Sequence, residues 1–229
     1  MGYLIAFDGI DAPGKTTQAK ILEKKLRDSG KDKDILYLTF PVYESESSAL
    51  VRLYLNGGLG KDPAQINPYA ASSFYAADRH ISYITGWQEF YGREKSIIIT
   101  DRYTTANAVH QLPKLPKSEW DGFLDWLYDY EFCKLNIPKP NLTVFFDMHP
   151  DVALKLIESR AQKTRAQKDI HESAPEYLKK CYEAGRYAAG YLGWETVICC
   201  KKDESGALVP ETQEKISEIL LGLVEKYYV

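Results

Sequence analysis

The sequence predicts an α/β fold in which helices cover both faces of a parallel β-sheet. Short apolar, strand-like runs alternate with helical patterns along the whole chain, which is typical of parallel strands joined by helical crossovers. The first run, residues 3–8, is apolar with hardly a break, as expected of a strand buried on both faces. The chain has 229 residues, 45% of them apolar, so we expect one domain with one core.

Five runs have the length and composition of strands. We expect them at residues 3–8, 35–39, 96–100, 142–146 and 196–199. Between them the sequence predicts helices from about residue 15 up to Gly30, at 45–55, 68–91 and 119–134, from residue 152 onward, at 176–192 and at 214–228. Glycine and proline mark several of the boundaries, as at Pro41 and at Gly57-Gly58.

The overall composition argues against several classes of protein. The formal net charge is only -3, so nothing marks the whole surface as a binder of nucleic acid or membrane. No apolar run approaches the roughly 20 residues that a membrane span needs, and residues 3–7 are too short for a signal-peptide core. The four cysteines, Cys133, Cys181, Cys199 and Cys200, show no metal-ligand spacing. We therefore expect reduced cysteines and a cytoplasmic protein.

A phosphate-loop motif follows the first expected strand. Residues 9–16, GIDAPGKT, match the pattern G-x-x-x-x-G-K-[ST] between an apolar strand and a helix. Glycines let backbone N–H groups converge on phosphate oxygens, and the helix N-terminus adds a positive dipole end. Lys15 should reach the β- and γ-phosphates of ATP, and the Thr16 hydroxyl should bind Mg²⁺. The expected ATP-binding residues are Gly9, Asp11, Ala12, Pro13, Gly14, Lys15, Thr16 and Thr17. The alternative is an ordinary strand-to-helix turn.

A second motif distinguishes kinases from other phosphate-loop proteins. The base-reading N-K-x-D motif of GTPases is absent from the sequence, and the strand at residues 96–100 ends in Asp101-Arg102-Tyr103 rather than Asp-Glu. An acid followed by a base at the carboxyl end of a central strand would place Asp101 near Mg²⁺ and Arg102 near an anionic acceptor. The alternative is that Asp101 caps the next helix and Arg102 is solvated.

Several segments in order resemble the thymidylate kinase family over nearly the whole chain. They are the phosphate loop, Phe40-Pro41-Val42-Tyr43, Tyr75 to Arg79, Asp101-Arg102-Tyr103, Asn107 with Gln111, and a basic stretch ahead of Asp169 and Glu172. Deoxynucleoside kinases usually carry serine where this chain has Tyr103, which favours the thymidylate kinase resemblance.

The resemblance implies a phosphate-loop kinase fold with a five-stranded parallel sheet and a short basic lid near residues 158–172, all within one nucleotide kinase domain at 1–229. It implies transfer of the γ-phosphate of ATP to dTMP with Mg²⁺, giving dTDP and ADP, and a homodimer. The alternatives are a kinase for a deoxynucleoside or another nucleoside monophosphate, and a nucleotide-binding switch that has lost transfer.

The resemblance also assigns residues to dTMP. Asp11 would accept a hydrogen bond from the sugar 3′-hydroxyl, and Arg102 would hold the acceptor phosphate. Tyr75 would stack on thymine while Arg79 donates to its O4 oxygen; the alternative is a core aromatic beside a surface charge. The full expected set is Asp11, Phe40, Tyr43, Tyr75, Arg79, Arg102, Asn107 and Gln111. His110 stands where the family often has tyrosine, at a position linked to exclusion of a ribose 2′-hydroxyl.

The expected lid supplies charge for the transferring group. Its basic residues are Arg160, Lys163, Arg165 and Lys168. Ala12 occupies a position where some family members carry a phosphate-loop arginine, so we expect Arg160 and Arg165 to act on the transferring phosphoryl group. Asp169 and Glu172 resemble the family's acidic pair near the metal or the acceptor. The alternative is a solvated basic helix face.

Overall fold

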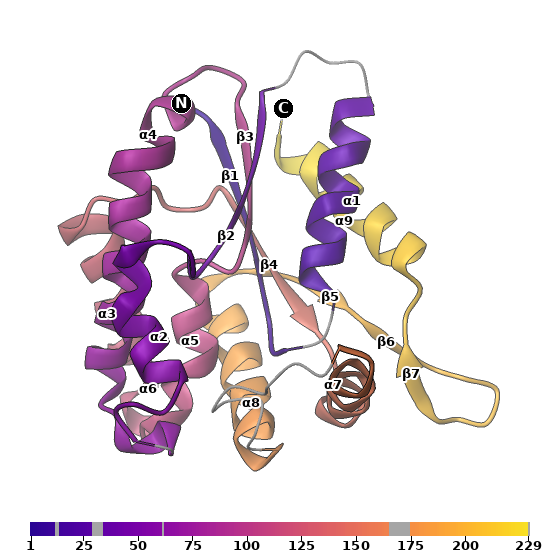
Figure 1. Ribbon diagram of the computed structural model, residues 1–229. Helices are drawn as coiled ribbons and strands as arrows, with labels where there is room; N and C mark the ends of the chain where they lie inside the picture. The colour runs from indigo at the N-terminus through magenta and orange to yellow at the C-terminus, as the bar shows by residue number, and fades with distance from the viewer. Residues whose placement is uncertain (12–13, 29–33, 61, 165–174, 229) are drawn as a thin grey trace.

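The computed structural model describes residues 1–11, 14–28, 34–60, 62–164 and 175–228, and its centre is a five-stranded parallel sheet (Figure 1). The strand order is β2-β3-β1-β4-β5, with every neighbouring pair parallel. The strands are β1 (Tyr3–Asp8), β2 (Ile35–Thr39), β3 (Ile97–Asp101), β4 (Leu142–Asp147) and β5 (Glu195–Ile198). All five expected strands are confirmed, each within one residue of its predicted bounds.

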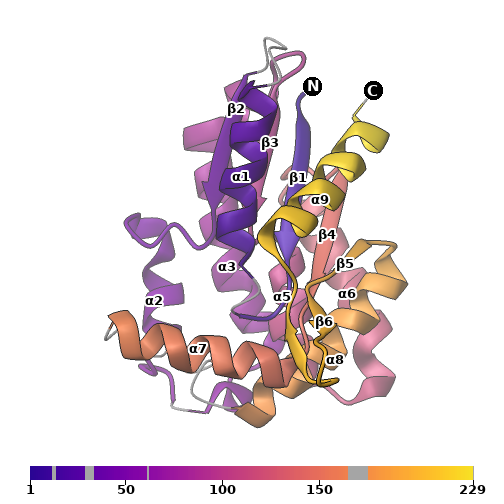
Figure 2. The same cartoon turned by 90° about the vertical axis from the view of Figure 1, so that its right-hand side faces the viewer.

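Helices cover both faces of this sheet. They are α1 (Lys15–Asp28), α2 (Ala49–Leu55), α3 (Pro68–Ser82), α4 (Gln88–Tyr91), α5 (Thr105–His110), α6 (Trp120–Tyr128), α7 (Pro150–Thr164), α8 (Pro175–Leu192) and α9 (Gln213–Tyr227). Helices α1 and α9 lie together on one side of the sheet, while α3, α5 and α8 lie on the other (Figure 1). Helix α7 runs across the edge where the strands end (Figure 2).

The position of β1 at the centre of the sheet explains why its sequence is almost entirely apolar. Leu4, Ile5, Ala6 and Phe7 are all 0% exposed, because β1 has a neighbouring strand on each side and helices above and below. Leu4 and Ala6 contribute to a core cluster with Trp87, whereas Ile5 and Phe7 belong to the larger cluster on the other side. The alternation follows from the two-residue period of a strand.

Two expected helices are interrupted by π-helical segments. The helix predicted at 68–91 contains η3 (Tyr83–Trp87), and the one predicted at 119–134 ends in η6 (Asp129–Lys134). Helix α5 was not predicted at all, because its sequence TANAVH is short and has no amphipathic period. Shorter 3-10 turns are η1 (Glu46–Ser48), η2 (Pro63–Gln65), η4 (Leu112–Lys114) and η5 (Lys117–Glu119).

A small antiparallel hairpin between β5 and α9 was also missed. Strands β6 (Cys200–Lys202) and β7 (Leu208–Pro210) pair with each other and project from the body of the protein (Figure 1). The turn is built by Asp203, whose carboxylate accepts from the backbone N–H of Ser205 at 2.9 Å and of Ala207 at 3.0 Å. Strands of only three residues are too short to show the alternation of apolar and polar side chains that identifies a strand. The turn-forming residues between them, in DESGA at 203–207, were recognisable in the sequence.

Two further expectations can be compared with the described residues. None of their helices combines the length and apolar character required to cross a membrane. All four cysteines are free thiols.

We predict that Gly185→Ala destabilises the fold. A Cβ at Gly185 in α8 would lie 2.6 Å from Cε2 of the buried Phe145, so either the ring of Phe145 or the helix must shift. Overpacking of this kind costs about 1–3 kcal/mol of unfolding free energy, measurable by urea denaturation. Gly190→Ala in the same helix is the control, because nothing lies within 4 Å of its Cβ position and alanine favours helix by up to about 1 kcal/mol. Equal effects of both changes would contradict this packing.

Candidate active site

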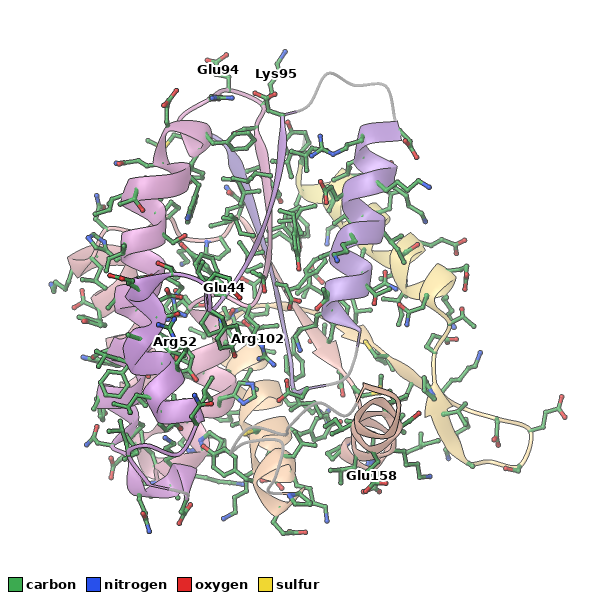
Figure 3. All side chains as sticks on the ribbon, viewed as in Figure 1. Glu44, Arg52, Glu94, Lys95, Arg102 and Glu158 are labelled. Atoms are coloured by element: carbon green, nitrogen blue, oxygen red, sulfur yellow. The ribbon has the colours of Figure 1, made fainter. Side chains whose placement is uncertain are left out.

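The register of the sheet brings three loops to one edge. Asp101 at the end of β3 is paired with Phe7 in β1 and with Thr39 in β2, so these strands end level. Arg102, which follows β3, therefore lies at the carboxyl edge of the sheet, whereas Lys95, which precedes β3, lies at the opposite end (Figure 3). This is the edge at which open parallel sheets bind ligands.

The phosphate loop leaves this edge from β1 and leads into α1. Gly9 and Gly14 have φ angles of 145° and 83°, which only glycine adopts readily. A Cβ at Gly9 would also lie 2.8 Å from the carbonyl oxygen of Phe146. Helix α1 begins at Lys15, so its N-terminus follows the loop as the motif predicts. Ala12 and Pro13 lie outside the described residues.

Lys15 is held inside the loop by backbone carbonyls. Its Nζ donates to the oxygens of Gly9 at 3.2 Å and Ile10 at 2.7 Å, and the residue is only 6% exposed. Burial, assisted by the positive charge of Arg102, lowers the pKa of Lys15 to about 8. Asp11, Asp101 and Asp8 act in the opposite direction, and a bound phosphate would add negative charge that favours the ammonium further.

Thr16 and Asp101 offer oxygen ligands at the first turn of α1. The Thr16 hydroxyl donates to the Asp101 carboxylate, and Thr17 is exposed beside it. In the described part of the chain, no three acidic, histidine or cysteine side chains gather as a metal site. The two oxygen donors suit Mg²⁺, which takes one or two protein ligands and completes its shell with phosphate oxygens and water.

Arg102 is fixed by its backbone and by its neighbours. It has a left-handed φ of 66°, a conformation that costs a non-glycine residue about 1–3 kcal/mol and occurs often at functional sites. Its guanidinium forms an ion pair with Asp11 and lies 4.0 Å from Asp8. Burial lowers the pKa of Arg102, but the two carboxylates raise it by a larger amount. The net pKa is therefore above its usual value.

The alternative for this motif is wrong in both of its parts. The Asp101 side chain binds Thr16 instead of capping a helix, and α5 begins only after Thr104. The Arg102 side chain is 21% exposed and paired, so it is not simply solvated. Arg102 also donates to His110 Nε2 at 2.9 Å. Because a guanidinium only donates, Nε2 must accept, which assigns a neutral His110 with its proton on Nδ1.

Asp8 is a structural member of the site that the sequence did not single out. It is 0% exposed and accepts from the backbone N–H of Gly9 at 3.2 Å and of Tyr103 at 3.4 Å, and from the Thr105 hydroxyl. Burial raises its pKa, although Arg102 and Thr105 act in the opposite direction. Asp8 therefore ties the phosphate loop to the segment after β3. The sequence signal that could have indicated Asp8 is an acidic residue at the end of an apolar strand.

A pocket beside the phosphate loop contains every residue expected to bind the acceptor. It is lined by Asp11, Phe40, Tyr43, Tyr75, Arg79, Arg102, Asn107 and Gln111, together with Pro41, Leu55, Ala106 and His110. Gln111 is 0% exposed, and within the described residues neither its Nε2 nor its Oε1 has a hydrogen-bond partner. A buried amide that lines a pocket without partners there is suited to meet a ligand. Leu55 and Ala106 were not predicted.

Helix α3 presents two of these side chains to the pocket. Tyr75 and Arg79 are four residues apart and therefore lie on one helix face. Tyr75 packs edge-on against Tyr54, with ring centroids 6.4 Å apart. Arg79 is 1% exposed and pairs with Glu131, so the alternative of a surface charge is wrong. Burial lowers the pKa of Arg79, but Glu131 raises it above its usual value.

The expected lid lies largely beyond the described part. Helix α7 includes Arg160 and Lys163, but the structure does not describe their side chains. Arg165, Lys168, Asp169 and Glu172 all lie outside the described residues. The lid assignments therefore stay predictions.

Comparisons with known proteins identify the family of this chain. A family model described as thymidylate kinase matches residues 7–189. A thymidylate kinase of Mycobacterium tuberculosis is 28% identical over 163 residues, covering 70% of this chain and 72% of that protein. A probable thymidylate kinase of Pyrococcus horikoshii is 30% identical over 173 residues, covering 74% and 76%.

A solved structure agrees with the fold. The thymidylate kinase of Candida albicans superposes with a TM-score of 0.66 at 20% identity, covering 98% of this chain and 92% of that one. Because the family model spans most of the chain, including the phosphate loop after Phe7 and the pocket residues, this chain belongs to the thymidylate kinase family.

Proposed function

We propose that this chain is a dTMP kinase that transfers the γ-phosphate of ATP to dTMP, giving dTDP and ADP. The observation that carries the proposal is that all eight expected acceptor residues line one pocket beside the phosphate loop. Membership of the thymidylate kinase family supports dTMP over the alternative acceptors.

The donor half of the site binds and orients the triphosphate. Lys15 moves from the carbonyls of Gly9 and Ile10 to the phosphates, and the N-terminus of α1 supplies backbone N–H groups. Mg²⁺, when bound at Thr16 and Asp101, would neutralise charge on the phosphates. No covalent intermediate is required, since in-line transfer depends on positioning and on charge stabilisation.

The acceptor half uses charges that are paired in the free protein. Arg102 exchanges its ion pair with Asp11 for the acceptor phosphate. Asp11 is then released to accept from the 3′-hydroxyl, and Tyr43 and Phe40 close the pocket around the phosphate. Tyr75 stacks on the base, with Arg79, Asn107 and Gln111 along its polar edge.

Further parts of the proposal rest on the family resemblance. We propose one kinase domain over residues 1–229 with a lid at about 158–172, acting as a homodimer in the cytoplasm. The four free thiols are consistent with a reducing compartment. Light scattering on the purified protein measures the oligomeric state, and a monomer would contradict the dimer.

The acceptor assignment is tested with a panel of nucleoside monophosphates and deoxynucleosides in a coupled ADP-release assay. We expect the highest kcat/KM for dTMP, exceeding that for dCMP by as much as about 10⁴- to 10⁵-fold, as in sites built on buried hydrogen bonds. A higher kcat/KM for another acceptor would replace dTMP. The absence of transfer to every acceptor would favour a non-catalytic switch.

Lys15→Met is expected to abolish transfer without unfolding the protein. The native pKa of about 8 lies below the value of the unfolded chain, so a charged Lys15 costs stability below pH 8. Relative to the variant, the wild type should therefore gain about 3 kcal/mol of unfolding free energy as pH rises from about 8 to about 10.5. The exposed Lys20→Met in the same helix is the control and should leave turnover unchanged. Normal turnover of Lys15→Met would refute the donor site.

Replacing both Arg160 and Arg165 with Ala should lower kcat by about 10²- to 10³-fold while changing the KM for dTMP little. The reason is that lid charges act on the transferring group in the transition state. Lys155→Ala, an exposed change in α7, is the matched control in steady-state kinetics. Unchanged kcat in the double variant would rule out the lid assignment.

A further inference from the structure

Glu131 is a buried carboxylate behind the acceptor pocket, with no role in the mechanism above. It lies in the π-helical segment η6 and is 0% exposed. A buried charge is costly unless it is paired and hydrogen-bonded. The contacts of the Glu131 carboxylate therefore indicate its role. Local π-helical geometry is also frequent at functional sites.

The contacts of Glu131 lead to two side chains of the pocket. Oε2 accepts from Arg79 Nε at 2.7 Å and from the Thr104 hydroxyl at 2.8 Å. Oε1 accepts from Arg79 NH2 at 2.5 Å and from Asn107 Nδ2 at 3.3 Å. A single carboxylate oxygen, Oε1, therefore holds both Arg79 and Asn107, and both of these residues line the pocket. Thr104 is not among the residues that line the pocket.

These contacts determine which atom of the Asn107 amide can meet a ligand. The amide nitrogen faces Glu131 and the carbonyl oxygen of Ser72, the latter at 3.4 Å. A carboxylate and a carbonyl only accept, so the atom between them must be the donor Nδ2. The acceptor Oδ1 is consequently the atom turned to the other side, where the residue lines the pocket.

Arg79 supplies the opposite polarity next to it. Glu131 occupies the Nε and NH2 edge of the guanidinium, and NH1 donates to the carbonyl of Tyr103 at 3.3 Å. The remaining N–H groups can only donate, so the pocket offers a donor beside an acceptor. Thymine complements this pair with its O4 acceptor and N3–H donor, whereas cytosine presents an amino donor and an N3 acceptor in the same order.

We propose that Glu131 is a positioning residue for base choice: it fixes the amide orientation of Asn107 and the place of Arg79, and so makes the pocket select thymine over cytosine. The inference rests on the proposed dTMP kinase activity. Glu131 does not touch the substrate and acts through the two side chains that it holds.

The test compares kcat/KM for dTMP and dCMP in the wild type and in Glu131→Gln. The new amide turns an N–H₂ group toward an N–H group of Arg79 in either orientation, and it allows Asn107 to reverse. We expect the dTMP to dCMP ratio to fall by roughly ten- to a hundredfold. Thr104→Val is the matched control, since it removes a hydrogen bond to the same carboxylate without touching Arg79 or Asn107. It should lower the melting temperature but leave the ratio unchanged.

A second variant keeps the inference testable if Glu131→Gln does not fold. Glu131→Asp keeps the negative charge opposite Arg79 but withdraws the carboxylate by one methylene, so one oxygen no longer holds both partners, and the ratio should again fall. An unchanged ratio in the folded variants, with only the melting temperature lowered, would reduce Glu131 to a stabilising role and overturn the inference. A wild type that prefers dCMP would instead overturn the proposed function, together with the polarity assigned to the pocket.

Discussion

The parallel register between β1 and β3 is the constraint on which the site depends. Phe7 pairs with Asp101, so the phosphate loop and the segment beginning with Arg102 start at the same height on adjacent strands. A slip of one residue would reverse the faces of β3 and turn the Asp101 side chain away from Thr16. Thr100 and Asp101 oppose such a slip, because it would break the hydrogen bond of the Thr100 hydroxyl to the Ile5 carbonyl at 3.3 Å and the contact of Asp101 with Thr16. The register of β3 therefore determines the positions of the side chains in the site.

The charges of the free site are already compensated before any substrate arrives. Arg102 is paired with Asp11, Lys15 is bound by carbonyls, and Thr16 satisfies Asp101. Each of these contacts is one that a phosphate, a sugar hydroxyl or a metal ion can replace. Pairing of this kind avoids the cost of isolated buried charges, and it keeps the groups in place so that little reorganisation is needed on binding.

Local patterns in the sequence were sufficient for most of the fold, whereas the pocket residues were predicted from the resemblance to the thymidylate kinase family. The strands were recognisable because their burial on two faces requires apolar runs, and the loop because glycine is required at Gly9 and Gly14. Glu131 was not recognisable, because its partner Arg79 lies 52 residues away in sequence and a lone acid in a helical pattern usually faces solvent. Helix α5 and the β6–β7 hairpin were missed because both are too short to show a period.

Helix α3 links the two ends of the acceptor site mechanically. Its pocket face carries Tyr75 and Arg79, while the adjacent Asp78 accepts from the backbone N–H of Val42 at 2.9 Å and from the Ser47 hydroxyl at 2.6 Å. The loop after β2, which carries Tyr43, is thus attached to the helix that carries Tyr75 and Arg79, the proposed base contacts. Because displacements of about 1 Å can cost two orders of magnitude in rate, a shared rigid support is the economical way to position base and phosphate together. Glu131 extends the same support to Asn107, so the side chains proposed to read the base and the loop that carries Tyr43 form one connected framework.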